Sequence, residues 1–85
     1  MKLSSPRPNP VSGISEFEVE TSESGYVEVM LYDAMGMQVK ELYAGEVASG
    51  VYLLRIDASE LSSGLYFCEL RRGNTVVRQH VIVTQ

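Results

Sequence analysis

Two copies of one short phrase limit what this chain can fold into more than any other feature. Ser49-Gly50-Val51-Tyr52 opens one apolar run, and Ser63-Gly64-Leu65-Tyr66 opens the next, fourteen residues later. Glycine reaches backbone angles that residues with a Cβ atom avoid, so it suits a corner of the chain. The β-branched and aromatic residues that follow suit a half-buried strand. The repeat therefore predicts a strand, a corner and a second strand.

Alternation of apolar and polar residues with a period of two continues along most of the chain. It predicts strands at residues 16–20, 26–32, 37–43, 51–57, 65–71 and 75–83. Asp33-Ala34-Met35-Gly36 is typical of a tight turn and Arg72-Gly73-Asn74 of a hairpin turn, and we expect a bulge in the third strand. No stretch has helical periodicity. We expect an all-β fold, an Ig/fibronectin-III-like antiparallel β-sandwich of six to seven strands.

The first thirteen residues differ in composition from the rest. They hold all three prolines of the chain, Pro6, Pro8 and Pro10, among several serines. Proline removes a backbone donor and disfavours helix in the residue before it, so this segment is predicted to be extended. A chain of 85 residues is the size of one domain. We therefore expect residues 1–13 to be a linker or lead-in and residues 14–85 to form a single β-sandwich domain.

Charge excludes some classes of function. The net charge is −4, whereas nucleic-acid binders cluster positive charge, so no nucleic acid is expected as a partner. Acids without bases occupy residues 14–33, and arginines without acids occupy residues 71–85. These stretches are either two solvated strand faces or a polar recognition surface. No run approaches the ~20 apolar residues of a membrane span, so we do not expect an integral membrane protein.

Residues that could carry catalysis or bind a metal are sparse. His80 is the only histidine, and Cys68 is the only cysteine, so no internal disulfide or thiolate cluster can form. Glu16, Glu18 and Glu20 alternate along one strand, so they point the same way instead of opposing one another across a cleft. We expect no enzyme activity, no catalytic or metal site and no cofactor. The five tyrosines are explained by packing or by a stripe that binds sugar or a partner.

Several motifs gain meaning from the order in which they occur. Pro8-Asn9-Pro10 precedes the strands, the stretch from Val29 to Gly36 ends one strand and makes its turn, and Gly64-Leu65-Tyr66-Phe67 opens another. The chain closes on an apolar strand that contains Val81 and Val83. This ordered set, over residues 8–83, resembles the type A C-terminal sorting domain of the type IX secretion system (Por secretion system) of Bacteroidetes. Met37 stands where that family often has arginine, and His80 stands near a position that is usually lysine.

The resemblance implies a function that composition could not supply. It implies a non-catalytic signal domain that directs a cargo protein across the outer membrane and is cleaved off after export. The implied partners are the outer-membrane type IX export machinery and a sortase-like peptidase. The implied location is the periplasm in transit, and then the cell surface or the medium. The sorting-motif residues carried over are Pro8, Asn9, Pro10, Tyr32, Asp33, Gly36, Gly64, Tyr66, Val81 and Val83.

A second hypothesis involves no signal. It describes the chain as a passive Ig-like accessory module, or a carbohydrate- or partner-binding module, of a larger extracellular enzyme or adhesin. For the secretion signal, we expect recognition through the last strand and the loops beside it. We expect residues 75–83 to form a sheet edge, where unpaired backbone groups are open to a partner. Because that strand is rich in valine, self-association through its edge is a further expectation.

Overall fold

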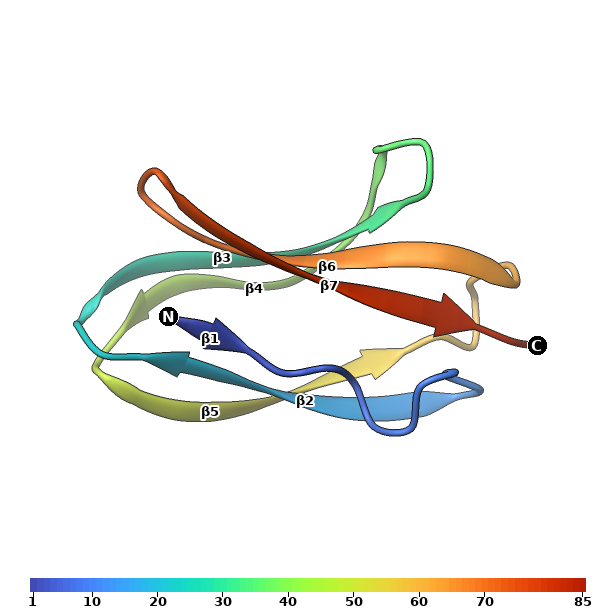
Figure 1. The fold of residues 1–85 in the computed structure, drawn as a ribbon, viewed down its shortest axis with the longest axis horizontal. Helices are drawn as coiled ribbons and strands as arrows, with labels where there is room; N and C mark the ends of the chain where they lie inside the picture. The colour runs from blue at the N-terminus through green and yellow to red at the C-terminus, as the bar shows by residue number, and fades with distance from the viewer.

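Two antiparallel sheets face each other across one core in the computed structural model, which describes residues 1–85 (Figure 1). The strands are β1 (Lys2–Leu3), β2 (Ile14–Thr21), β3 (Gly25–Asp33), β4 (Gln38–Val47), β5 (Gly50–Asp57), β6 (Gly64–Arg72) and β7 (Thr75–Val83). One sheet has the order β1-β2-β5, and the other has the order β4-β3-β6-β7. The predicted all-β sandwich is therefore confirmed.

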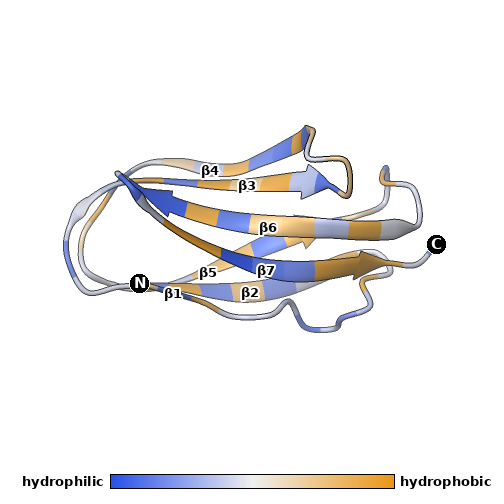
Figure 2. Ribbon diagram, turned by 45° about the horizontal axis from the view of Figure 1, so that its top comes forward, coloured by the Kyte–Doolittle hydropathy of each residue, from blue (hydrophilic) through white to orange (hydrophobic).

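The core follows directly from the alternation in the sequence. In β2, Phe17 and Val19 are buried, while the glutamates between and beside them face outward. Figure 2 shows the same banding of hydrophobic and hydrophilic residues along the other strands. The core cluster consists of Leu3, Val11, Phe17, Val19, Val27, Val29, Leu31, Ile56, Ala58, Tyr66, Cys68, Leu70, Val81 and Val83.

The two copies of the Ser-Gly phrase form the same structural device. Gly50 and Gly64 begin β5 and β6 with nearly equal φ values, 153° and 156°. The Tyr52 hydroxyl donates to the carbonyl oxygen of Ala48 at 2.5 Å, and the Tyr66 hydroxyl donates to that of Ser62 at 2.7 Å. Each tyrosine thus ties the start of its strand to the residue four positions earlier, as in the tyrosine corner of β-sandwiches.

Register shifts interrupt the pairing of β3 with β4. They lie between Val29 and Met30 and between Leu31 and Tyr32, where β4 carries an extra residue each time. This confirms the bulge expected in the third predicted strand. A bulge bends the strand that carries it, and β4 is an edge strand, where bulges are common.

Residues 1–13 are extended, but they lie on the sandwich and contribute to its core. Leu3 and Val11 are only 4% and 0% exposed, and Pro6 is also fully buried. The backbone of Arg7 pairs with that of Glu16, and Val11 pairs in parallel with Val83. The Arg7–Pro8 and Asn9–Pro10 peptide bonds are cis. The sequence prediction drew the boundary of the sandwich after residue 13, whereas the packed unit begins near Leu3.

The glutamates of β2 and two of the arginines near the C-terminus lie on opposite outer faces of the sandwich. Glu16, Glu18 and Glu20 alternate with the buried residues of β2, so they face outward from the three-stranded sheet. Arg71 and Arg78 face outward from the four-stranded sheet, on β6 and β7. These two sets of side chains therefore point away from each other. Elsewhere the two stretches meet, because Glu28 lies opposite Arg71 and Arg72 pairs with Glu23 at 3.8 Å.

Candidate functional site

The Pro8-Asn9-Pro10 segment meets the closing strand β7 through the side chain of Asn9. The Asn9 Nδ2 group donates to the carbonyl oxygen of His80 at 3.3 Å, and Asn9 Oδ1 accepts from the backbone N–H of Ile82 at 3.0 Å. These are the two bonds that the backbone of a neighbouring strand would make. The amide of Asn9 thus takes the place of a strand beside Val81.

Val11 continues the same contact with its own backbone. Its N–H donates to the carbonyl oxygen of Ile82 at 2.6 Å, and its carbonyl oxygen accepts from the N–H of Thr84 at 2.9 Å. Together, Asn9 and Val11 cover the edge of β7 from His80 to Thr84. By the alternation of an antiparallel strand, Val76 and Arg78 direct their backbone groups to the same edge, and no protein partner covers them. The edge considered for self-association is therefore half covered.

Pairing of β6 with β7 brings together the motif residues of the two strands. Gly64 lies opposite Val83, and Tyr66 lies opposite Val81. Val81 and Val83 are 0% and 1% exposed, so their side chains belong to the core and not to the surface. The same register places Asp33 of β3 opposite Tyr66 on its other side.

Asp33 and Gly36 build the turn between β3 and β4. The Asp33 Oδ1 atom accepts from the N–H groups of Met35 at 3.0 Å and Met37 at 2.9 Å, and the carbonyl oxygen of Asp33 accepts from the N–H of Gly36 at 3.0 Å. Gly36 has φ +86°, a conformation that glycine adopts without strain. The turn projects beyond the sheet (Figure 1) and exposes Met35 and Met37.

The sequence-predicted motif residues gather at one end of the four-stranded sheet. The β3–β4 turn, the start of β6, the end of β7 and the Pro8–Pro10 segment all lie toward this end, which is the right-hand end in Figure 1. Asp33, Tyr66 and Val81 form one row across three strands. Residues that are far apart in the sequence thus meet at one end of the sheet, which we call the motif end.

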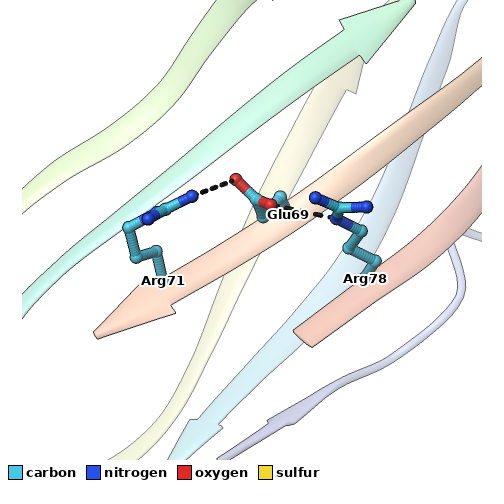
Figure 3. A network of polar contacts seen from close by, with 3 residues as sticks. All are labelled: Glu69, Arg71 and Arg78. Atoms are coloured by element: carbon cyan, nitrogen blue, oxygen red, sulfur yellow. Dashed lines mark hydrogen bonds and ion pairs between the residues drawn. The ribbon is translucent and has the colours of Figure 1, made fainter. Parts of the chain in front are cut away.

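A charged network that the sequence did not reveal lies on the outer face of the same sheet (Figure 3). Glu69 is 2% exposed, although its side chain points away from the core. Arg71 Nη2 donates to Glu69 Oε2 at 3.3 Å, and Arg78 Nε donates to Glu69 Oε1 at 3.0 Å. The cross-strand pair Glu69–Arg78 depends on the register of β6 with β7, which the sequence alone does not give.

Hydrogen bonding sets the protonation state of this network. Burial by itself raises the pKa of Glu69, but hydrogen bonds from Arg78, Arg71 and Tyr32 outweigh it, so the pKa lies below its ordinary value. The pKa of Tyr32 is raised by burial and then by the negative charge of Glu69. Glu69 is therefore ionised at neutral pH and Tyr32 is protonated.

Cys68 and His80, the remaining candidates for chemistry, lie in surroundings that favour a structural role. Burial and the nearby Glu69 raise the pKa of Cys68 to about 12, so its thiol stays protonated. His80 is exposed, and its ring centroid lies 5.1 Å from that of Phe67. No three His, Cys, Asp or Glu side chains lie close enough together to hold a metal ion. The structure also has no helix of the length and apolarity needed to span a membrane.

The tyrosines do not form a common stripe. The hydroxyl groups of Tyr52 and Tyr66 are used by their own corners, and Tyr66 is buried. Tyr26 is the most exposed, at 52%, on the outer face of β3, whereas Tyr43 folds over Gly45 in β4. Packing therefore accounts for most of the tyrosine content.

A comparison with protein families agrees with the order of the motifs. A family model described as "Secretion system C-terminal sorting domain" matches residues 7–84. The matched range includes Pro8-Asn9-Pro10 as well as β7. A search of curated proteins gives no match.

Proposed function

Because this chain belongs to the family of secretion system C-terminal sorting domains, we propose that its signal is a composite surface, in which the Pro8–Pro10 segment and β7 are held together. The family is the C-terminal sorting signal for type IX secretion and is not catalytic. It implies interaction with the type IX machinery and export to the cell surface or the medium. The resemblance seen in the motif order is confirmed by this membership.

One observation carries the proposal. The side chain of Asn9 bonds to the backbone on both sides of Val81, so the first and the last motif of the chain are in direct contact. A receptor that binds the end of β7 would therefore also meet Pro8 and Pro10, which are exposed. We infer that the receptor contacts this junction.

The other motif residues have a supporting role in this proposal. The Asp33 Oδ1 atom already accepts two N–H groups of its own turn, and the Tyr66 hydroxyl is bound to Ser62. Val81 and Val83 are buried. We infer that these residues shape the motif end and that the receptor reads the backbone and exposed side chains around them.

The path and processing of the cargo are part of the same proposal. We propose that the chain passes through the periplasm and that a sortase-like peptidase removes it after export. Leu3, Pro6 and Val11 are buried, and a peptidase needs an extended, accessible segment. We therefore place the cleavage point before Leu3.

Export of a reporter protein tests the proposal. The reporter is fused to residues 1–85 in a bacterium with a type IX system, and its amount outside the cell is measured. Deletion of Val81–Gln85 and the single change Asn9→Ala should each leave most of the reporter in the periplasm. Asn74→Ala serves as the control, because Asn74 is exposed and makes no side-chain hydrogen bond. Undiminished export of a folded Asn9→Ala fusion would contradict the composite signal.

A further inference from the structure

The outer face of β6 and β7 carries a shallow depression of about 270 Å³ beside the β3–β4 turn. Tyr32 and Phe67 form its apolar part, and Arg71 and Arg78 form its basic part. Glu69 lies beneath the two arginines. We call the surface formed by Phe67, Arg71, Arg78 and His80 the arginine face.

Both guanidinium groups have donors to spare. Arg71 bonds to Glu69 through Nη2, and Arg78 bonds to it through Nε. A guanidinium carries five N–H donors in all, so most donors of each remain available. The side chains of Arg71 and Arg78 remain 48% and 65% exposed. Both guanidinium groups are exposed, whereas the Glu69 carboxylate between them is buried. Asp33, the other carboxylate that lines the depression, already uses its Oδ1 atom in its own turn.

Glu69 fixes the positions of the arginines before anything binds. Its two oxygens each hold a different arginine, at 3.3 Å and 3.0 Å, from two neighbouring strands. A long side chain that is already ordered loses less conformational entropy on binding than a free one. The arrangement in Figure 3 is therefore suited to receiving an anion.

Aromatic and apolar side chains continue the same face to one side of these charges. Phe67 and His80 lie opposite each other across β6 and β7, with ring centroids 5.1 Å apart. Leu65 and Ile82 form the next pair along the strands and are 40% and 44% exposed. Aromatic residues and arginine together are typical of the central part of a protein–protein interface.

We propose that the arginine face binds an acidic segment of a partner protein, with Arg71 and Arg78 holding one carboxylate and Phe67 contacting the side chain beside it. A carboxylate matches the planar fork of a guanidinium. A doubly charged phosphate is less suitable, because the carboxylates of Glu69 and Asp33 also line the depression. This inference goes beyond the sorting signal at the motif end, and it holds or fails in a binding assay without any export.

An NMR titration of the ¹⁵N-labelled chain tests the proposal. The probe is the peptide Glu-Val-Glu-Val-Glu with blocked ends, and the signals followed are the Nε–Hε groups of the arginines. We expect the Arg71 and Arg78 signals to shift together. Arg78→Gln should weaken binding by about tenfold, the loss expected for one hydrogen bond between charged groups. Arg55→Gln is the matched control, since Arg55 is an exposed arginine, paired with Glu16, on the opposite sheet.

Four results would overturn the proposal. The first is equal affinity of the peptide for the Arg78→Gln and Arg55→Gln variants. The second is tighter binding of inorganic phosphate than of the peptide at this face, and the third is binding only to phosphatidylglycerol vesicles. Arg78→Lys keeps a cation beside Glu69, so it is used in place of Arg78→Gln if the Arg78→Gln variant does not fold. Arg78→Lys should weaken binding of the peptide on the order of threefold. Unchanged affinity in the folded Arg78→Lys variant is the fourth contrary result.

Discussion

Replacing Asn9 by alanine should open the C-terminal half of the β7 edge. The change removes the 3.3 Å bond to the carbonyl oxygen of His80 and the 3.0 Å bond from the N–H of Ile82. A typical hydrogen bond contributes about 0.5–1.5 kcal/mol to stability, so two bonds contribute about 1–3 kcal/mol. Both backbone partners lie at an exposed edge, where water can replace the amide. We therefore expect a loss of about 1–2 kcal/mol from the free energy of unfolding.

Urea unfolding followed by circular dichroism measures this loss. For a domain of this size, about 1 kcal/mol corresponds to a fall of about 4–8 °C in Tm, so thermal unfolding gives a second reading. Hydrogen exchange adds a local reading, because the Ile82 amide loses its acceptor and should exchange on the order of tenfold faster. Asn9→Asp keeps an acceptor for Ile82 but loses the donor to His80, so its effect on Ile82 exchange should be smaller.

Asn74→Ala is the control variant for this prediction. Asn74→Ala removes an exposed asparagine with no side-chain hydrogen bond, and it should leave the urea midpoint and Ile82 exchange nearly unchanged. If Asn9→Ala also leaves both unchanged, the amide of Asn9 does not act as a strand beside Val81. The composite surface would then lose its physical basis.

Three further substitutions test other parts of the structure. Because its pKa lies below the ordinary 4.5, Glu69 contributes stability that is present above about pH 4.5 and is lost as the pH falls through the folded value. Glu69→Gln should therefore flatten the fall of the urea midpoint below about pH 4.5, and an unchanged slope would contradict this. Tyr66→Phe removes the 2.7 Å bond to Ser62 and should cost about 0.5–1.5 kcal/mol in urea unfolding, and a cost near zero would refute the corner. Gly36→Ala meets no atom within 4 Å but must hold φ near +86°, so it should cost about 1–2 kcal/mol, and a neutral or stabilising result would count against that turn geometry.

Local sequence patterns predicted the parts of the fold that depend on local physics. Alternation located the six long strands because each strand has one buried face, and the Ser-Gly phrases marked two equivalent corners. Asp33 and Gly36 predicted their turn because the turn is closed by local interactions. The Asp33 side chain accepts from two N–H groups of the turn, and Gly36 supplies its positive φ. Such features need no knowledge of which strand lies beside which.

Contacts between distant parts of the chain could not be predicted in the same way. Prolines indicate an extended backbone but not whether it packs, so the burial of Leu3 and Val11 was missed. The bonds of Asn9 to β7 and the pairing of Glu69 with Arg78 depend on strand register. The motif residues were found by resemblance, and the structure adds that they meet at one end of the sheet.

Reporter export in paired strains tests the central claim most directly. A reporter fused ahead of residues 1–85 is followed in a type IX-competent bacterium and in an otherwise identical strain that lacks the export machinery. We expect the reporter at the cell surface or in the medium only in the competent strain, and inside the cell in the other. Retention of the reporter in both strains, or equal release from both, would contradict the assignment of this chain as a type IX sorting signal.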